Sequence, residues 1–386
     1  MTLQRSTSTL FIIVRVPRSA GISGLTLARC LRRRNIPAIV YERVKDNPTR
    51  NNYGITLRHD TWQSLLEPLQ IDERDFKRQL GVRHPKTDAV VEDDGALRVN
   101  RAALTRVLQE GVDVMWEHKL TNLPSSDETR TANFDVNGST ENVDYSLLIG
   151  ADGVHSATRS ALKLGQIDFE MKTLPYVVFN GKRRIKPSSQ ASESLFTAFD
   201  KPDGVLYRHG QVALSIKGDF WDPAKDTVAI SYTLSRPAKD GDKSLIDRNI
   251  SDAEKLAAQF KDEVATLKDL PPPFDAVFNE DQMIGDRLLH WLMRSSLVGS
   301  DALQKSVKSQ GVVVLGDATH AQPIPGYGAN TAIADAIELA KHISPDGKID
   351  IAKFLQARAE SWAGDKESAE QDLSNLHDAG TSQSML

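Results

Sequence analysis

Cysteine is almost absent from this chain, since Cys30 is the one cysteine among 386 residues. A single thiol cannot form an internal disulfide, so the sequence predicts a protein of a reducing compartment. Cys30 lies in an apolar stretch with helical character, where we expect it to act as a small core residue. No apolar run approaches the roughly 20 residues that span a bilayer, and the polar start lacks a signal-peptide core. We therefore expect a cytoplasmic protein without a membrane span.

Neither sign of charge dominates, because the formal net charge is −4. This balance gives no support for a nucleic-acid partner. The basic run Arg32-Arg33-Arg34 falls at the expected end of a helix, where cations face the negative end of the helix dipole. We interpret this run as solvated surface rather than a phosphate or membrane patch. No two histidines have the H-x-x-x-H spacing of a zinc-binding helix, and we expect no metal site.

The chain contains two kinds of apolar and polar sequence pattern. Strand, helix and strand patterns at the start predict a βαβ unit with parallel strands. From about residue 172 to 290, apolar and polar residues alternate between turn signals, which is typical of a half-exposed, largely antiparallel sheet. The expected strands are 10–14, 36–43, 145–153 and 311–320, and the expected helices are 24–34, 101–110, 253–268, 330–343 and the charged tail 350–377.

The first motif that carries chemistry is the turn after the first strand. The stretch "SAGISG" fits G-x-G-x-x-G with Ser19 in the place of the first glycine. Gly21 would let the backbone approach a pyrophosphate, and Gly24 would let the helix pack closely on the strand. The helix that follows offers N–H groups and a positive dipole end to phosphates. Glu42, at the end of the second strand, stands where an acidic side chain binds a ribose hydroxyl.

Two further motifs follow buried strands. The first is "GADGVHSATR", with Asp152-Gly153 directly after the strand. The second is "GDATHAQPIPGYGAN", in which Gly316-Asp317 is followed by Pro323, Gly326, Gly328 and Asn330. An acidic residue at the carboxyl end of a parallel strand can accept a hydrogen bond from a ligand hydroxyl. The glycines after it let the backbone pass close to a flat ring before the next helix begins.

In this order and at this separation, the three motifs resemble those of the FAD-dependent aromatic-ring monooxygenases of the p-hydroxybenzoate hydroxylase type. "DGVHSATR" resembles their D-G-x-x-S-x-x-R, and "GDATHAQPIPGYGAN" resembles their G-D-A-A-H…P…G-x-G-x-N. Arg101 in "LRVNRAALTRVL" resembles the arginine that opens their next helix. The resemblance spans roughly residues 10–345.

The resemblance implies an α/β fold: a Rossmann-like FAD-binding domain with an inserted β-rich substrate domain and C-terminal helices. The implied divisions are 1–172 and 291–345 for the FAD-binding domain, 173–290 for the substrate domain and 346–386 for the helical tail. It also implies that NAD(P)H reduces FAD, that oxygen adds to the reduced flavin, and that the hydroperoxide hydroxylates or epoxidises an apolar or aromatic small molecule. The partners are then this substrate and oxygen, in a monomer or homodimer.

Because the cofactor carries the reactive chemistry, the implied site residues are binding residues, and none is assigned as catalytic. They are Ser19, Gly21, Gly24, Glu42, Arg43, Arg101, Asp152, Gly153, Asp317, Pro323, Gly326, Gly328, Ala329 and Asn330. His320 belongs to the third motif, and we favour a role in holding a loop over proton transfer. We favour a structural role for Trp291 and Arg294, where the β-rich region rejoins the FAD domain.

The chain departs from the family pattern at two places. Arg15 to Arg18 intervene between the first strand and its turn, and Ser19 adds a β-carbon where a glycine is usual. The loop after His320 is about one residue shorter than usual, which would tighten the turn around the flavin ring. These departures keep an alternative open: a relative with impaired FAD binding and no turnover, or a gene-model error at residues 15–19. An NAD(P)-dependent dehydrogenase would not need the two later motifs, and the W-x-W-x-I-P motif of flavin halogenases is absent.

Overall fold

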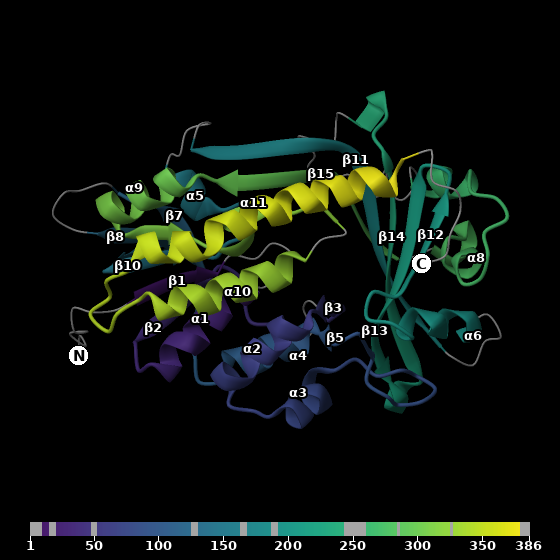
Figure 1. Cartoon of the computed structure of the whole chain (residues 1–386), viewed down its shortest axis with the longest axis horizontal. Coiled ribbons are helices and arrows are strands. Elements are labelled where there is room, and N and C mark those ends of the chain that lie inside the picture. The colour runs from purple at the N-terminus through teal and green to yellow at the C-terminus, as the bar shows by residue number, and fades with distance from the viewer. Residues whose placement is uncertain are drawn as a thin grey trace.

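The computed structural model describes residues 10–14, 21–47, 52–124, 130–162, 168–186, 192–242, 260–283, 286–324 and 327–378. The predicted site residues Ser19 and Gly326 lie outside these ranges, as does the inserted stretch Arg15 to Arg18. Figure 1 shows the parallel strands toward one end of the molecule and strands β12 to β14 at the other. Two helices, α10 and α11, lie side by side along it.

A parallel sheet of strand order β16-β10-β1-β2-β6 forms the first layer. Its strands are β1 (Leu10–Val14), β2 (Ala38–Glu42), β6 (Asp113–Trp116), β10 (Leu147–Gly150) and β16 (Val312–Val314). Helix α1 (Ile22–Arg33) connects β1 to β2, which pair in parallel, so the predicted βαβ unit is confirmed. Both β10 and β16 are buried along their whole length, as expected for parallel strands covered on both faces.

Two of the expected strands end several residues earlier in the structure than in the prediction. The strand expected over 145–153 is β10, which ends at Gly150, and the one expected over 311–320 is β16, which ends at Val314. Apolar and small residues continue into the turns that follow these strands, because the turns are themselves packed in the interior. At both places, the buried stretch of the chain therefore extends beyond the last residue of the strand.

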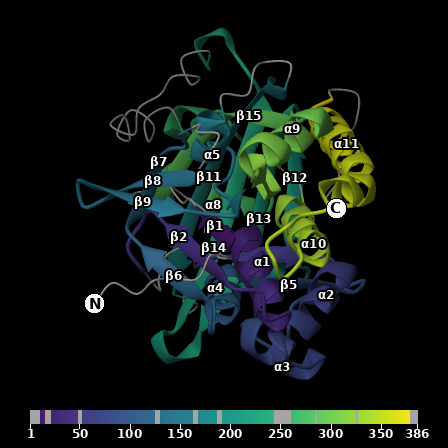
Figure 2. The same cartoon turned by 90° about the vertical axis from the view of Figure 1, so that its left-hand side faces the viewer.

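Helices and a small sheet cover the parallel sheet. Helix α1 packs with α4 (Arg101–Gln109) and α10 (Gly328–Lys341), as Figure 2 shows. The small antiparallel sheet consists of β7 (His118–Asn122), β8 (Thr131–Val136) and β9 (Ser139–Asp144). It contacts the parallel sheet where the ring of Tyr41 stacks on Phe134, with 4.5 Å between the ring centroids. Cys30 is buried in this core, as predicted, and Arg32 to Arg34 are exposed.

The second large sheet has the order β12-β13-β14-β11-β15-β17 and is antiparallel, as the alternating pattern predicted. Its strands are β11 (Phe169–Ile185), β12 (Val205–His209), β13 (Val212–Asp222), β14 (Thr227–Pro237), β15 (Arg287–Val298) and β17 (His320–Ala321). Side chains alternate between its faces. Phe179 and Tyr232 are buried on one face, next to Phe260, whereas Asn180 and Thr233 are half-buried on the other.

A third sheet lies between the two large ones. It has the order β3-β5-β4, with β3 (Gly54–Leu57), β4 (Glu92–Asp93) and β5 (Ala96–Asn100). The remaining elements are α2 (His59–Leu69), α3 (Glu73–Leu80), α5 (Ala157–Ala161), α6 (Ser192–Leu195), η1 (Phe196–Phe199), η2 (Pro223–Lys225), α8 (Phe274–Val277), η5 (Glu280–Met283), α9 (Ser300–Gln310) and η6 (Gly316–Ala318). Of the predicted helix 253–268, the described part is helical over 260–265.

The charged tail forms the long helix α11 (Ile351–Leu376), as predicted. Trp362 and Phe354 are buried in the core around the parallel sheet. Near the other end of the helix, Leu373 packs with Leu174 and Met293 of the antiparallel sheet. This helix therefore joins both large sheets. No helix in the described ranges is both long enough and apolar enough to cross a membrane.

Candidate functional site

The carboxyl ends of the parallel strands gather the predicted motifs at one edge. In the sheet register, Val14 is the partner of Glu42, Ile13 of Gly150, and Gly150 of Val314. The backbone N–H of Leu315 also donates to the carbonyl of Gly150, with 2.9 Å between N and O. The segments that follow these strand ends therefore leave the sheet side by side. Ligands of open α/β sheets bind at this edge.

The turn at Gly316 packs against the first turns of two helices. Gly316 has φ +62°, and a β-carbon there would lie 2.9 Å from Ser23 Oγ in α1 and 3.3 Å from the β-carbon of Ala332 in α10. Only glycine accepts both the left-handed backbone and this close approach. A β-carbon at Gly328, the first residue of α10, would lie 3.5 Å from Asp317 Oδ1. The N-termini of α1 and α10 thus flank the turn that carries this acidic side chain.

Asp317 and Arg101 bring opposite charges to this edge. Arg101 is 4% exposed and is the first residue of α4. Burial raises the pKa of Asp317 above its usual value, while the charges of His320 and Arg101 oppose this shift. Arg101 also donates its backbone N–H to the carbonyl of Tyr53 at 2.8 Å. Two of the predicted site residues therefore interact electrostatically at the sheet edge.

Asp152 holds the second motif together. Its carboxylate accepts hydrogen bonds from the Ser156 hydroxyl, from the backbone N–H of Thr158 at 2.9 Å and from the Thr158 hydroxyl at 3.1 Å. Gly153 has φ +75° and open space where a β-carbon would stand. Arg159, at the end of the motif, donates to the carbonyl of Ala318 at 2.7 Å. The second motif is thereby bonded to the third.

The other predicted residues lie around this edge with different degrees of burial. Glu42 is buried, and one of its carboxylate oxygens accepts the backbone N–H of Val44 at 3.1 Å. Gly24 and Pro323 are buried, whereas Gly21, Arg43 and Ala329 are half-buried. Among the described residues, no group of histidine, cysteine and acidic side chains could hold a metal ion.

Asn330 fixes a segment that the sequence did not single out. Its Oδ1 accepts the backbone N–H of Arg58 at 2.8 Å, and its Nδ2 donates to the carbonyl of Thr56 at 3.0 Å. The guanidinium of Arg58 lies 3.9 Å from the ring centroid of Tyr327. The start of α10 is therefore clamped to β3. No local pattern in the sequence marks Thr56 or Arg58, because the contact joins segments far apart in the chain.

A half-buried polar face of the antiparallel sheet adjoins the same segment. Asn180, Lys182, Ser231 and Thr233 belong to this face, and Asn180 Nδ2 donates to Thr233 Oγ1 at 3.0 Å. The Nζ of Lys182 lies 3.3 Å from the ring centroid of Tyr53. The guanidinium carbon of Arg101 lies 5.3 Å from the same centroid. Tyr53 thus links the polar sheet face to the edge of the parallel sheet.

Comparison with known proteins identifies the family. A family model described as FAD binding domain matches residues 85–205. FAD-dependent monooxygenase adaC of Aspergillus niger is 30% identical over 366 residues, which cover 86% of this chain and 85% of the relative. The chain belongs to the FAD-dependent monooxygenases. FAD is the cofactor of this monooxygenase, and NAD(P)H is the reductant typical of the family.

A second relative agrees with this assignment, and solved structures share the fold. FAD-dependent monooxygenase aptC of Emericella nidulans is 32% identical over 360 residues, covering 83% of this monooxygenase and 84% of the relative. The structure of 2,6-dihydroxypyridine-3-hydroxylase from Arthrobacter nicotinovorans matches with a TM-score of 0.69 at 19% identity, over 98% and 94% of the two chains. Klebsiella pneumoniae HpxO with FAD and uric acid matches with a TM-score of 0.63 at 19% identity, over 95% and 89%. These structural matches confirm the predicted α/β fold with its β-rich region.

The residues of the monooxygenase at the sheet edge fit FAD. Backbones approach closely at Gly316, and helix N-termini favour the negative charge of a pyrophosphate. Within the described ranges, the Nδ1 atom of His320 is buried and has no hydrogen-bond partner. A polar atom is therefore available for a bound group close to this edge. Asp317 and Glu42 supply carboxylates that accept hydrogen bonds from hydroxyl groups.

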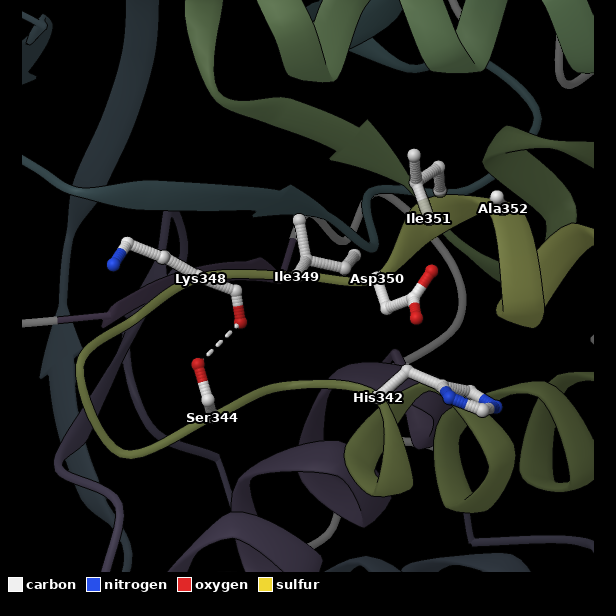
Figure 3. Close-up of a pocket in the computed structure, with 7 residues that line it drawn as sticks. All are labelled: His342, Ser344, Lys348, Ile349, Asp350, Ile351 and Ala352. Atoms are coloured by element: carbon white, nitrogen blue, oxygen red, sulfur yellow. Dashed lines mark hydrogen bonds between the residues drawn. The ribbon is translucent and has the colours of Figure 1, made fainter.

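Two features lie away from this edge. Trp291 of the antiparallel sheet packs against a cluster that contains Val178 and Met293 of the same sheet and Leu373 of α11, and its structural role stays a prediction. Figure 3 shows a depression between the end of α10 and the start of α11. It is lined by His342, Ser344, Lys348, Ile349, Asp350, Ile351 and Ala352, none of which belongs to the three motifs.

Proposed function

We propose that this monooxygenase hydroxylates or epoxidises an apolar or aromatic small molecule, with NAD(P)H as the reductant. The observation that carries the proposal is the packing of the Gly316-Asp317 turn against the first turns of α1 and α10. This packing supports a cofactor that lies along the carboxyl edge of the parallel sheet. When bound and reduced, FAD supplies the activation of oxygen, and the chain orients the reactants and excludes water.

In this proposal, each motif residue serves one part of FAD. Ser19, Gly21 and Gly24 face the pyrophosphate, Glu42 and Arg43 the adenosine ribose, and Arg101 and Asp317 the pyrophosphate and ribityl region. Asp152 and Gly153 lie where cofactor binding and NAD(P)H use meet. Pro323, Gly326, Gly328, Ala329 and Asn330 form the surroundings of the isoalloxazine, with Asn330 acting through its clamp on Thr56 and Arg58.

The substrate is proposed to lie over the polar face of the antiparallel sheet. Two observations support this location. The rings of Phe179 and Tyr232 are buried on the opposite face, whereas Asn180 and Thr233 on this face are half-buried and so still accessible to a small molecule. Asn180 and Thr233 offer hydrogen bonds to oxygen substituents of a ring, and Leu289 offers apolar contact. We keep as part of this proposal the predicted division into a FAD-binding domain (1–172 and 291–345), a substrate domain (173–290) and a tail (346–386).

Purification of the full chain tests the proposal. We expect a yellow protein whose flavin is FAD and which oxidises NAD(P)H in the presence of oxygen and an aromatic substrate. Product analysis by mass spectrometry should show the gain of one oxygen atom. A chain that binds FAD and reduces it with NAD(P)H, but adds oxygen to no member of an aromatic panel, would contradict the proposed substrate class.

A matched variant separates this function from the alternative of impaired FAD binding. The variant lacks Arg15 to Arg18 and carries Ser19→Gly, which restores the usual family turn. Binding of FAD by both proteins supports the leading proposal. Binding by the variant alone supports the alternative, in which the sequence at Arg15 to Ser19 prevents cofactor binding.

A further inference from the structure

A tryptophan lies beside Glu42 at the carboxyl edge of the parallel sheet, on a strand that carries none of the predicted motifs. This strand, β6, is the last in the order β16-β10-β1-β2-β6 and ends at Trp116. In the parallel register of β2 and β6, Trp116 is the partner of Glu42. Paired residues of neighbouring strands point to the same face of a sheet, and such strands are about 5 Å apart. The indole therefore shares a face of the sheet with the Glu42 carboxylate.

The backbone around Trp116 is held in place by contacts on both sides. Glu117 has φ +61°, a left-handed conformation that turns the chain aside directly after the strand. The carbonyl of Trp116 accepts a hydrogen bond from Nδ1 of His118 at 2.6 Å, and the backbone N–H of Glu117 donates to the carbonyl of Val44 at 3.4 Å. The ring of His118 also packs edge-on against Tyr41, with 5.4 Å between the centroids. The end of β6 is thereby tied to the segment that follows Glu42.

The side chain of Trp116, in contrast, takes little part in the interior. Its neighbours Val114 and Met115 pack against the core around the parallel sheet. Trp116 is half-buried, and among the described residues it neither joins that core nor donates its indole N–H to an acceptor. The buried Trp62 differs, because its indole N–H donates to the carbonyl of Gly95 at 2.9 Å. A large flat ring on a fixed backbone is thus left at the sheet edge, where it can stack on another flat ring.

The order of the strands places this ring where the adenosine half of FAD would end. In the proposed site, the pyrophosphate lies at the turn after β1, and the adenosine ribose lies at Glu42 at the end of β2. The base and the pyrophosphate are attached to opposite ends of this ribose. A cofactor that continues in the same direction across the sheet therefore brings its adenine to β6, the strand beyond β2, and to Trp116.

We propose that Trp116 binds the adenine ring of FAD by stacking, and that this contact makes the chain prefer FAD to FMN. The proposal rests on the proposed cofactor site, with Glu42 at the adenosine ribose. Stacking between a nucleic-acid base and an aromatic side chain stabilises binding without the need for a hydrogen bond. FMN ends at its phosphate and has no adenine, so it gains nothing from Trp116. ADP has the adenine and the pyrophosphate but no flavin, so it gains the same contact as FAD.

Calorimetric titration of the full-length apo-protein with FAD and with FMN tests the contact. In Trp116→Ala, we expect the Kd for FAD to rise about tenfold, which corresponds to roughly 1.4 kcal/mol, and the Kd for FMN to stay unchanged. Trp116→Phe keeps an aromatic face and should retain most of the affinity for FAD. An unchanged Kd for FAD in Trp116→Ala would overturn the proposal. Equal losses for FAD and FMN would also overturn it, because they would show general damage to the site.

Tryptophan fluorescence with ADP gives a second readout, which keeps the test open if FMN binds too weakly or Trp116→Ala does not fold. ADP does not absorb where tryptophan emits, so quenching reports contact with the ring rather than energy transfer. We expect saturating ADP to quench the wild-type emission, and we expect this quenching to be lost in Trp116→Phe.

Trp221→Ala is the matched control, because Trp221 is a half-buried tryptophan of β13 that packs against the core of the antiparallel sheet. It should keep both the quenching by ADP and the wild-type Kd for FAD. A wild-type chain that binds FAD but whose emission does not change with saturating ADP would overturn the role of Trp116. A wild-type chain that binds neither FAD nor ADP would instead contradict the proposed cofactor site.

Discussion

At the scale of single residues, Gly316 is a position where geometry restricts the sequence strongly. Its left-handed backbone and its approach to Ser23 both exclude a side chain. Gly138 has φ +83° but nothing within 4 Å of the place of a β-carbon, so it provides a matched comparison. The difference between the two positions isolates the cost of close approach from the cost of the backbone conformation.

We expect Gly316→Ala to destabilise the protein by roughly 2 to 4 kcal/mol, from the left-handed backbone and the contact with Ser23 together. Gly138→Ala should cost about 1 to 2 kcal/mol, from the backbone alone. Urea unfolding of the two variants measures both changes. Equal destabilisation would show that the turn can move away from α1, which the packing described above does not allow.

Asn330 makes a second prediction at this scale. Asn330→Ala leaves the carbonyl of Thr56 and the N–H of Arg58 without their partner, so we expect a loss of about 1 to 3 kcal/mol of unfolding free energy. FAD affinity should fall as well, because the start of α10 is no longer clamped to β3. The exposed Asn142 offers a control, and Asn142→Ala should change stability by less than about 0.5 kcal/mol. Unchanged FAD affinity in Asn330→Ala would show that the hydrogen bonds of Asn330 to Thr56 and Arg58 do not contribute to the proposed cofactor site.

The sequence predicted the motif residues but not their partners. Gly21, Glu42, Asp317 and Gly328 carry local patterns, because glycine turns and strand ends have characteristic spacing. The contacts of Asn330 with other segments have no such pattern, since they depend on how distant parts of the chain meet. Which charges surround His320 is likewise a property of packing rather than of spacing.

At the scale of elements, a buried ion pair joins the third sheet, β3-β5-β4, to the large antiparallel sheet. Arg98 of β5 lies 3.3 Å from Asp219 of β13, and the side chains are 5% and 1% exposed. Asp219 also accepts the backbone N–H of Gly54 at 2.9 Å and the hydroxyl of Ser231 at 2.6 Å. Burial raises the pKa of Asp219, against the opposing charge of Arg98 and these hydrogen bonds.

Removal of Arg98 makes stability depend on pH. Arg98→Met leaves an unpaired buried carboxylate and should cost about 3 to 5 kcal/mol at pH 7.5. The pKa of Asp219 then rises further, and a carboxyl whose folded pKa is raised favours folding at low pH and loses this contribution as the pH rises. The destabilisation should therefore be smaller at pH 5 than at pH 7.5 in urea unfolding.

An exposed pair provides the control for this experiment. Arg78 and Asp75 are 63% and 42% exposed, and Arg78→Met should change stability by less than about 1 kcal/mol at either pH. A destabilisation by Arg98→Met that does not vary with pH would show that Asp219 stays ionised or finds another partner.

Periodicity explains which elements the sequence could predict. The apolar run before Gly21, the branched strand 36–43 and the alternating segments of the β-rich region have clear periods, and strands form there. Domain boundaries stay a prediction, and β15 continues from Arg287 to Val298 through the predicted division after residue 290. When one strand runs through a domain boundary, the pattern of apolar and polar residues does not change there, so the sequence does not mark the boundary.

At the scale of the whole molecule, α11 couples the two large sheets. Leu373 is fully buried against the antiparallel sheet, and Trp362 lies in the core of the parallel sheet. We expect the two sheets to unfold together in one transition. Hydrogen exchange in β10 and in β14 should then show the same dependence on urea, and two separate transitions would contradict this coupling.

A cavity at Leu373 should lower the stability of both large sheets. Leu373→Ala is expected to cost about 2 to 5 kcal/mol and to lower protection in β10 as well as in β14. Saturation with FAD at about 100 times its Kd should add about 2.7 kcal/mol to the stability of both sheets. A gain confined to β10 would separate the cofactor edge from the antiparallel sheet.

The order of strands in the parallel sheet has a consequence for synthesis of the chain. Strand β1 is made well before its neighbour β10, which ends at Gly150, and before β16, which ends at Val314. Helix α11, which packs on α10, is not complete before Leu376. A nascent chain therefore cannot close the cofactor edge until these late segments have left the ribosome, and we expect FAD to be taken up only after that point.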